Sequence, residues 1–319
     1  MSFKIASYGA EHEWADHPLD RDPPKGFGRD VNDVTIVNSN GIANDPKGKT
    51  YRFGGEFNTP PTTTIEGQVQ CMERLKEHYP EATINYRSNL HLHVRIPGLK
   101  DNLAMLKQLQ SHIHRELPLV LAETVEPIPV PIPEEYPGTL ELKGARRRFA
   151  RRRVSHQCFL SAHRVAYQCQ ATTVKEFFER EPPLSKEEPR KPLWHLQPRV
   201  CVNLRQLLQT DTIEFRHFPG TMDPRELQAA FTWVKMYTEA ALADAPIHTL
   251  KILARGWLFP LFLKYEHNVE TRYRRTVHDG SLKQQDILLA VSDILRQPDG
   301  NLEKAREWMI MHGYSKGVL

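Results

Sequence analysis

The chain has 319 residues, of which 39% are apolar and 26% are charged, a balance that is typical of a folded globular protein and excludes an intrinsically disordered one. This length is compatible with one large domain that carries insertions. The formal net charge of +4 comes from 43 Lys and Arg against 39 Asp and Glu, so overall charge does not indicate a nucleic-acid packaging protein.

The first part of the chain is predicted to alternate between strands and helices. Polar and apolar patterning predicts strands at residues 3–14, 34–38, 51–58 and 90–96. Gly54 and Gly55 give the third of these strands freedom to bend or bulge. Thr63 and Glu66 form a capping box that predicts the start of a helix, and Asp101 is expected to cap a second helix.

An insertion is predicted around residues 118–192, between the second helix and the next strands. Prolines at positions 127, 129, 131, 133 and 137 are incompatible with a helix or a central strand, so this part should be an extended connector or flap. The run from Lys143 to Arg153 then carries seven basic residues and no acidic one. A second polar loop with prolines follows at residues 179–192.

The last part of the chain returns to regular structure. Strands are predicted at residues 200–204 and 212–218, and we expect them to pair. Asp223, followed by Pro224, is typical of a helix start. A helical extension is expected around residues 245–319, and the whole chain, residues 1–319, is interpreted as a single catalytic domain.

Four predicted strands each offer a pair of polar residues two positions apart. The pairs are Glu11 and Glu13, Glu56 and Asn58, His91 and His93, and Glu214 and Arg216. Side chains two apart on a strand point to the same face of a sheet, so each pair should project together. An ordinary solvated face is the alternative, but such a face would show more Lys, Thr and Ser, whereas these residue types bind divalent metals or phosphate.

A metal is the simplest reason for two adjacent carboxylates. Glu11 and Glu13 repel each other unless a cation lies between them, so the pair indicates a divalent ion. Imidazole suits Mn²⁺ and Zn²⁺ better than Mg²⁺. His91 and His93 therefore leave two hypotheses open, an ATP site with mixed ligands and a zinc hydrolase.

The ordered motifs GAEHE, GGEFNTPP, LHLHV and TIEFRHFPGT resemble those of the amidoligases, which are similar to glutamine synthetase and glutamate–cysteine ligase. The resemblance extends from about Gly9 to the helix after Asp223. It implies a glutamine synthetase-like α+β fold, with a curved, mostly antiparallel catalytic sheet and helices on one face. Family members more often carry glycine just before the HxH motif, where this chain has Asn89 and Leu90.

The resemblance also implies an activity and residue roles. The activity is ligation of a carboxylate to an amine through an acyl phosphate, using ATP with Mg²⁺ or Mn²⁺. Catalytic roles fall on Glu56, His93 and Arg216, and Arg216 and His93 also contact the nucleotide. The implied metal ligands are Glu11, Glu13, Glu56, His91 and Glu214. Further candidate nucleotide contacts are Arg95, Arg199 and Asn203, although an exposed arginine and a turn asparagine explain the last two equally well.

Two other functions compete with this reading. One is a zinc hydrolase that uses His91 and His93. The other is a nucleic-acid-binding protein that acts through residues 143–153, with the sheet only structural; that run can contact nucleic acid or another polyanion, or be a solvated helix face. The number of carboxylates in the motifs argues against both. The chain has neither a P-loop nor a GxGxxG motif, so ATP would bind on the sheet.

The remaining features concern compartment and membrane. The four cysteines form no CxxC pair and residues 1–10 carry no secretory signal, so we expect a reduced, cytoplasmic setting. The longest strongly apolar stretch, residues 257–263, is interrupted by Pro260 and is much shorter than the ~20 residues of a spanning helix. No membrane association is predicted.

Overall fold

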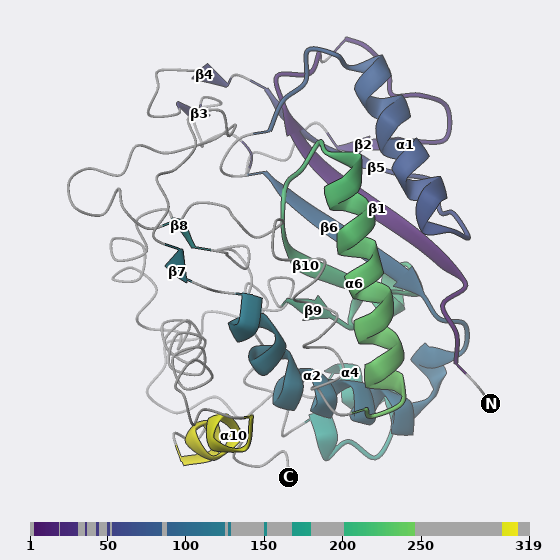
Figure 1. Cartoon of the computed structure of the whole chain (residues 1–319). Coiled ribbons are helices and arrows are strands. Elements are labelled where there is room, and N and C mark those ends of the chain that lie inside the picture. The colour runs from purple at the N-terminus through teal and green to yellow at the C-terminus, as the bar shows by residue number, and fades with distance from the viewer. Residues whose placement is uncertain are drawn as a thin grey trace, which may run out of the picture.

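The computed structural model covers the whole chain and has an open six-stranded sheet at its centre (Figure 1). The residues that it describes are 3–18, 20–30, 36, 43–44, 50–51, 53–84, 88–124, 127–128, 150–151, 168–179, 201–245 and 302–311. The strand order is β2-β5-β1-β6-β10-β9, and every pair is antiparallel. The strands are β1 Ser7–Ala15, β2 Gly28–Asp30, β5 Gly54–Asn58, β6 Asn89–Arg95, β9 Val202–Asn203 and β10 Thr212–Pro219. This sheet with its helices makes the fold α+β.

Two long helices, α1 and α6, pack against each other and cover one face of the sheet (Figure 1). The helices are α1 Ile65–His78, the 3₁₀ helix η1 Leu99–Asp101, α2 Leu103–Thr124, α4 Val174–Glu179, α5 Gln206–Gln209, α6 Pro224–Leu242 and α10 Leu302–Met311. Two small antiparallel pairs join β3 Ala43–Asn44 to β4 Thr50–Tyr51, and β7 Pro127–Ile128 to β8 Ala150–Arg151. The opposite face of the sheet is therefore free of α1 and α6.

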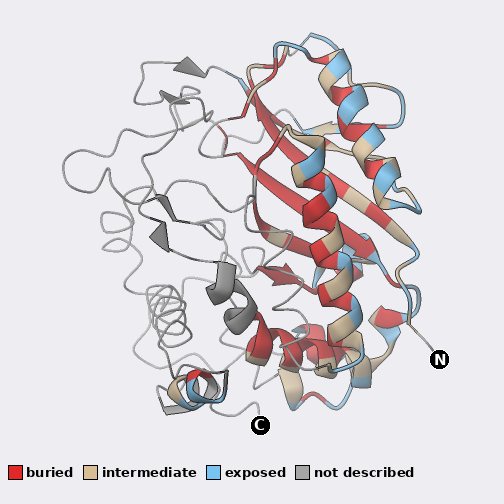
Figure 2. Ribbon diagram, viewed as in Figure 1, coloured by how far each residue is buried: buried red, intermediate tan, exposed pale blue. Residues whose placement is uncertain are grey.

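The hydrophobic core lies between the sheet and these two helices. Alternate residues of the central strands, such as Leu90 and Leu92, are fully buried there, as is Phe231 of α6 (Figure 2). The ring of Tyr8 packs edge-on against that of Phe231 at 5.7 Å between centroids. Burying each large apolar side chain contributes about 1.5–3 kcal/mol. Every second residue of the central strands thus faces the helices, and the residues between them lie on the other face.

The first two predicted helix starts differ from the structure by one residue, whereas Asp223 caps α6 as predicted. Thr64, not Thr63, caps α1, and its hydroxyl accepts a hydrogen bond from the Gly67 amide at 3.1 Å. Asn102 replaces Asp101 as the cap of α2, with its side-chain oxygen 3.0 Å from the Met105 amide. Asp101 instead ends η1. These capping residue types compete at adjacent positions, and only the tertiary path of the chain selects one.

The strand predictions are confirmed in position but not in every detail. β1 begins four residues later than predicted, at Ser7, and the strand predicted for residues 51–58 begins at Gly54. No bulge interrupts the pairing of β5 with β1 at the two glycines. A Cβ at Gly55 would lie 2.6 Å from His17 Nε2, so this glycine serves close packing. The register shift lies instead in β10, between Phe215 and Phe218.

Several predictions lie outside the described residues. They concern the strand at residues 34–38 except Ile36, most of the insertion and most of the C-terminal extension. β2 was not predicted, because three residues carry no usable periodicity. Within the part of the chain that the structure describes, no helix is both long and apolar enough to cross a bilayer.

Candidate functional site

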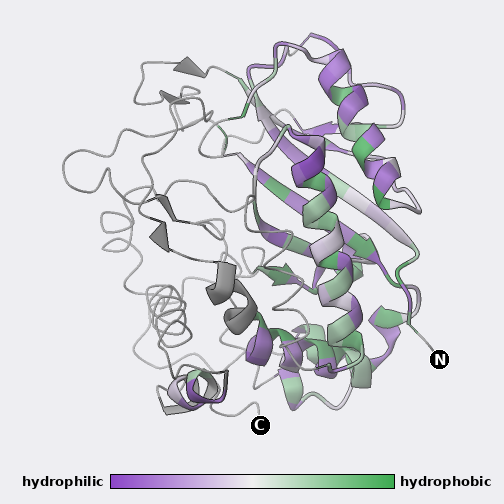
Figure 3. Cartoon of the chain, in the orientation of Figure 1, coloured by the Kyte–Doolittle hydropathy of each residue, from purple (hydrophilic) through white to green (hydrophobic). Residues whose placement is uncertain are grey.

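Polar side chains of five strands gather on the face of the sheet that is turned away from α1 and α6, which we call the polar face. Residues opposite each other in an antiparallel sheet share a face. The register places these pairs opposite one another: Glu11 and His91, Glu13 and Glu56, Glu214 and His93, and Glu214 and Asn203. Figure 3 shows hydrophilic and hydrophobic residues side by side along these strands. The predicted two-residue spacing therefore does bring the pairs together.

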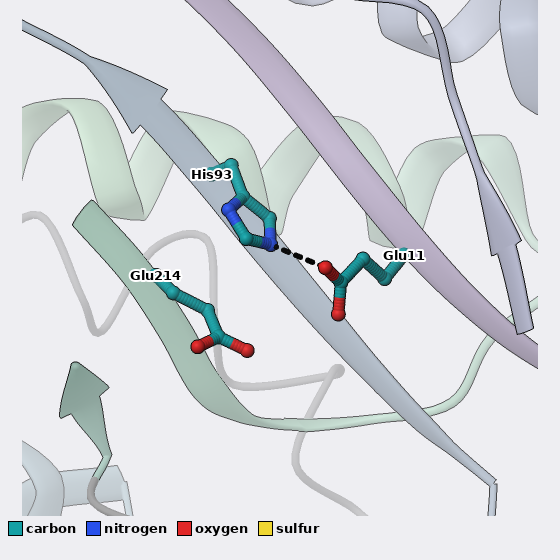
Figure 4. A group of neighbouring side chains, drawn as sticks. All are labelled: Glu11, His93 and Glu214. Carbon is teal, nitrogen blue, oxygen red and sulfur yellow. Dashed lines mark ion pairs between the residues drawn. The ribbon is translucent and has the colours of Figure 1, made fainter. Parts of the chain in front are cut away.

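Glu11 is at the centre of the polar face. His91 Nδ1 donates a hydrogen bond to Glu11 Oε2 at 2.9 Å, and His93 Nε2 lies 3.0 Å from Glu11 Oε1 (Figure 4). Burial acts to raise the pKa of the Glu11 carboxyl, but its contacts with the two rings outweigh burial and hold the pKa well below its ordinary range. Glu11 is thus a permanent anion.

The imidazole of His91 lies among three carboxylates. Besides its bond to Glu11, it is 3.6 Å from an oxygen of Glu13 and 3.6 Å from an oxygen of Glu214. Burial and the charge of Arg216 act to lower the pKa of His91, but the carboxylates around the ring dominate and raise it. The carboxylates around the ring thus favour its protonated, positively charged form.

Glu56 completes the acidic cluster on its β5 side. Burial, followed by the negative charge of Glu11, raises the pKa of Glu56 to about 7. The Asn58 amide donates to Glu56 Oε1 at 3.3 Å, which offsets only part of this effect. One carboxyl of the cluster therefore holds a proton near neutral pH while its neighbour Glu11 does not.

The raised pKa of Glu56 predicts a pH-dependent stability of the metal-free protein. A carboxyl with a folded-state pKa of about 7, against its ordinary 4.5, stabilises the fold below pH 4.5 and loses that contribution as the pH rises through 7. Glu56→Gln mimics the protonated form, so with a chelator present it should be more stable than the parent by about 1–3 kcal/mol above neutral pH. Urea unfolding at acidic and alkaline pH measures the difference.

A matched control and a metal arm sharpen this test. Glu73→Gln, at an exposed position of α1, should show no such pH dependence. Mn²⁺ added at alkaline pH should favour the parent over Glu56→Gln, since a cation relieves the repulsion among ionised carboxylates. A stability difference that stays constant across this pH range would show that Glu56 titrates as an ordinary surface carboxyl.

Two groups of side chains on the polar face have the composition and spacing of a metal site. One comprises Glu11, His93 and Glu214 (Figure 4), and the other comprises Glu11, Glu56 and His91. Within each group the ligand atoms lie within 4.8 Å of one another. Both groups contain Glu11, so its two oxygens can serve two ions. Each group has two carboxylates and one imidazole, a set that suits Mn²⁺ and accommodates Mg²⁺.

The ring nitrogen of His93 supports the fit of a cation. Although Nε2 lies 3.0 Å from Glu11 Oε1, it is buried and forms no aligned hydrogen bond with any described residue. A buried ring nitrogen that faces carboxylate oxygens requires a proton or a metal between them. His91 and His93 fall in different groups, whereas a zinc hydrolase of the predicted kind needs both imidazoles on one ion.

Two other predicted site residues, Glu13 and Arg216, lie near the two groups but belong to neither. Glu13 belongs to neither group; its Oε2 accepts hydrogen bonds from the Asn89 backbone at 2.7 Å and the Asn89 side chain at 2.9 Å. Arg216 lies beside the site, where Nη1 donates to Glu214 Oε1. Its side chain is 22% exposed, so the guanidinium can also meet a ligand.

The remaining predicted nucleotide contacts are less central. Both ends of the Asn203 side chain are hydrogen-bonded within the protein. Its Nδ2 donates to Glu214 Oε2 at 2.8 Å, and its Oδ1 accepts from the backbone N–H of Arg205 at 3.0 Å. Arg95 is half exposed and pairs with Asp211 at 2.9 Å, at the end of β6. Arg199 lies outside the described residues, as do residues 143–149 and 152–153 of the basic run.

Three asparagines hold carboxylates of the polar face, a role that the sequence analysis did not predict, although it paired Asn58 with Glu56 and named Asn203 as a candidate nucleotide contact. Asn58, Asn89 and Asn203 each donate to one oxygen of Glu56, Glu13 and Glu214, respectively. A neutral amide donor fixes one carboxylate oxygen and leaves the charge in place, so the other oxygen is presented in a defined direction. The two-residue spacing along a strand predicts part of this set: Asn58 shares a strand face with Glu56, and Asn89 shares one with His91.

His217 follows Arg216 in β10, and alternation along a strand places its side chain on the opposite face. Its ring lies on the helix-covered face, 5.0 Å from that of Trp233 in α6. Its Nδ1 is 3.4 Å from the Cys201 carbonyl oxygen, and complete burial lowers its pKa to about 4. The neutral ring of His217 is part of the core.

Comparisons with known proteins add no assignment: a scan against models of protein families found no match, and a search of curated proteins found no similar sequence. The class of this protein is therefore described from its fold and its site alone. The protein is an α+β protein with an open antiparallel sheet, one face of which carries a buried cluster of carboxylates and imidazoles beside an arginine.

Proposed function

We propose that this protein is an ATP- and divalent-metal-dependent ligase that joins a carboxylate to an amine, on a glutamine synthetase-like sheet. The observation that carries the proposal is the pair of acidic, imidazole-containing groups that share Glu11, with Arg216 alongside. A shared ligand would place two ions close together, as the adjacent phosphates of a nucleotide require. The four sequence motifs that resemble amidoligases supply all of these residues.

The residues of the two groups have distinct tasks in this proposal. One ion would be held by Glu11, His93 and Glu214, and the other by Glu11, Glu56 and His91. Bound ions supply the positive charge that neutralises the phosphates of ATP during transfer. Asn203 keeps Glu214 oriented through one oxygen, so that the other is available to the site.

The reaction needs two successive displacements. In the first, a carboxylate oxygen of the substrate attacks the γ-phosphorus of ATP, and the bond to ADP breaks. In the second, the amine attacks the acyl carbon, its C–N bond forms, and phosphate leaves as the amine loses a proton. Arg216 offers a planar fork for two oxygens of the transferring phosphoryl group. Glu56, which the sequence motifs implicate in catalysis, is the carboxylate that we assign to accept the proton of the amine.

The competing functions gain less support. A zinc hydrolase would draw His91 and His93 to one ion, and these residues lie in separate groups. Nothing described in the structure favours a nucleic-acid-binding function, so residues 143–153 enter the proposal only as a candidate contact for a polyanionic acceptor. We place the reaction in the cytoplasm, where ATP is available.

The decisive experiment is nucleotide binding with and without added metal. Calorimetry should show that ATP affinity depends on Mn²⁺ or Mg²⁺, and that Mn²⁺ is bound more tightly because each group has an imidazole. Phosphate release should then require both a carboxylate and an amine from substrate panels, and hydroxylamine should trap the activated carboxylate as a hydroxamate. Stoichiometric zinc in the purified protein, with no metal-dependent ATP affinity, would favour the hydrolase instead.

A further inference from the structure

A chain of three hydrogen-bonding contacts links His93 to the backbone of α5. His93 Nδ1 lies 2.9 Å from Thr212 Oγ1, which lies 2.7 Å from Thr210 Oγ1. The Thr210 hydroxyl in turn donates to the Gln206 carbonyl at 3.2 Å. We propose that Thr212 and Thr210 are positioning residues, which hold a hydrogen on His93 Nδ1 and so reserve Nε2 for a divalent cation.

The direction of this chain follows from its far end. The carbonyl of Gln206 can only accept, so the single hydroxyl hydrogen of Thr210 is directed to it. Either threonine can donate in the contact between them, and with the Thr210 hydrogen directed to Gln206 we assign the donor as Thr212. With its hydroxyl hydrogen used, Thr212 can only accept from the ring of His93, so Nδ1 is the donor. The later steps follow from the first, in which the Thr210 hydroxyl donates to the Gln206 carbonyl.

The other ring nitrogen of His93 faces the acidic group. Nε2 is 3.0 Å from Glu11 Oε1, and Glu214 completes the group (Figure 4). When the ring is neutral and Nδ1 carries the hydrogen, Nε2 has a lone pair directed among carboxylate oxygens, and a proton or a metal ion is needed to satisfy both sides. A histidine that binds metal through one nitrogen is commonly oriented by a hydrogen bond from the other.

Local backbone geometry brings the two hydroxyls together. Thr210 ends α5, and Asp211 has a positive φ of 59° that turns the chain into β10, where Thr212 is the first residue. Aspartate tolerates this left-handed conformation better than most residues. Arg95, at 2.9 Å, and Lys100, at 3.6 Å, form ion pairs with the carboxylate of Asp211. The turn thus places Thr210 and Thr212 in line with His93.

Two substitutions at position 212 separate the hydroxyl from the shape of the side chain. Thr212→Val keeps the branched shape and removes the hydroxyl, whereas Thr212→Ser keeps the hydroxyl. Selective ¹⁵N-histidine labelling, with the His93 signals assigned from a His93→Gln variant, reports which ring nitrogen carries hydrogen while the ring is neutral and no metal is present. Mn²⁺ affinity is measured on the same proteins by electron paramagnetic resonance.

We expect the parent and Thr212→Ser to carry the hydrogen on Nδ1, and Thr212→Val to lose that preference. Mn²⁺ affinity should fall about 10- to 100-fold in Thr212→Val, the usual effect of removing a group that orients a ligand, and should recover in Thr212→Ser. Thr232→Val is the matched control, since its exposed hydroxyl also donates to a backbone carbonyl, that of Gln228 at 2.8 Å. This variant should change neither measurement.

The inference rests on the proposed function only in taking the ligand to be a cation. If the parent binds no Mn²⁺, the ligase proposal fails, and the NMR measurement still decides the state of His93. A parent ring with its hydrogen on Nε2, or a Thr212→Val protein with unchanged tautomer and unchanged Mn²⁺ affinity, would overturn the inference. Should Thr212→Val not fold, Thr210→Val breaks the chain at its exposed end and must change the tautomer in the same direction.

Discussion

Glu11→Gln is expected to abolish divalent metal binding at both groups of the polar face. Glu11 is the one residue that the two groups share, and its pKa keeps it ionised at any physiological pH. A neutral amide retains the size of the side chain but not the charge, and its nitrogen cannot bind a metal. Mn²⁺ affinity should therefore fall by more than about 100-fold, beyond the range for groups that only orient ligands. Paramagnetic resonance counts the ions bound.

The number of ions lost distinguishes a shared ligand from an ordinary one. Loss of a single ion would show that Glu11 serves one group and that the other is independent. Glu73→Gln again serves as the control, because this exposed α1 residue carries the same charge change. Far-UV circular dichroism should show the parent fold in both variants, since Gln can still accept a hydrogen bond from His91 Nδ1.

The second large effect is expected for Arg216→Lys. Lysine keeps the positive charge beside Glu214 but has no planar fork for two phosphoryl oxygens. If Arg216 stabilises phosphoryl transfer, turnover should fall by roughly 10²-fold or more, as on removal of one transition-state donor. The melting temperature should stay near that of the parent, because the exposed part of the side chain leaves the ammonium access to water.

A purely structural Arg216 predicts the opposite combination. Glu214 is completely buried and Arg216 is its cationic partner, so a failed ion pair would destabilise the fold by about 3–5 kcal/mol. Activity would then be lost only through unfolding. Arg225→Lys is a matched control, since Arg225 also pairs with a carboxylate, that of Asp223, but at an exposed position. A stable Arg216→Lys protein with most of its turnover would remove this residue from the chemistry.

The sequence predicted the polar face well because two simple rules govern it. Strand side chains alternate between the two faces of a sheet. Because Leu90 and Leu92 are buried on the helix-covered face, His91 and His93 must point to the opposite face. The α+β class, the pairing of β9 with β10 and the core position of His217 follow from the same alternation. Residue type and spacing were sufficient for all of these.

Other features depend on contacts between distant segments, which spacing does not encode. The hydrogen bonds that Glu13 accepts from Asn89 depend on the exact register of two neighbouring strands. The bulge in β10 and the choice of Thr64 as a cap depend on how the chain fits its neighbours. The contact from His93 to Thr212 joins residues that are 119 positions apart. Such details need the tertiary structure.

The register of the central strands has a consequence for how this protein can evolve. Glu11 lies opposite His91, and Glu214 opposite His93, through backbone pairing that is continuous from Ser7 to His12 of β1. Point substitutions can change one ligand at a time and leave the others in place. Inserting or deleting a single residue in β1 would instead turn its carboxylates toward the core and expose Trp14. We therefore expect length variation among related chains to concentrate in the connections, and the spacing within β1 and β6 to be preserved even where residue identity is not.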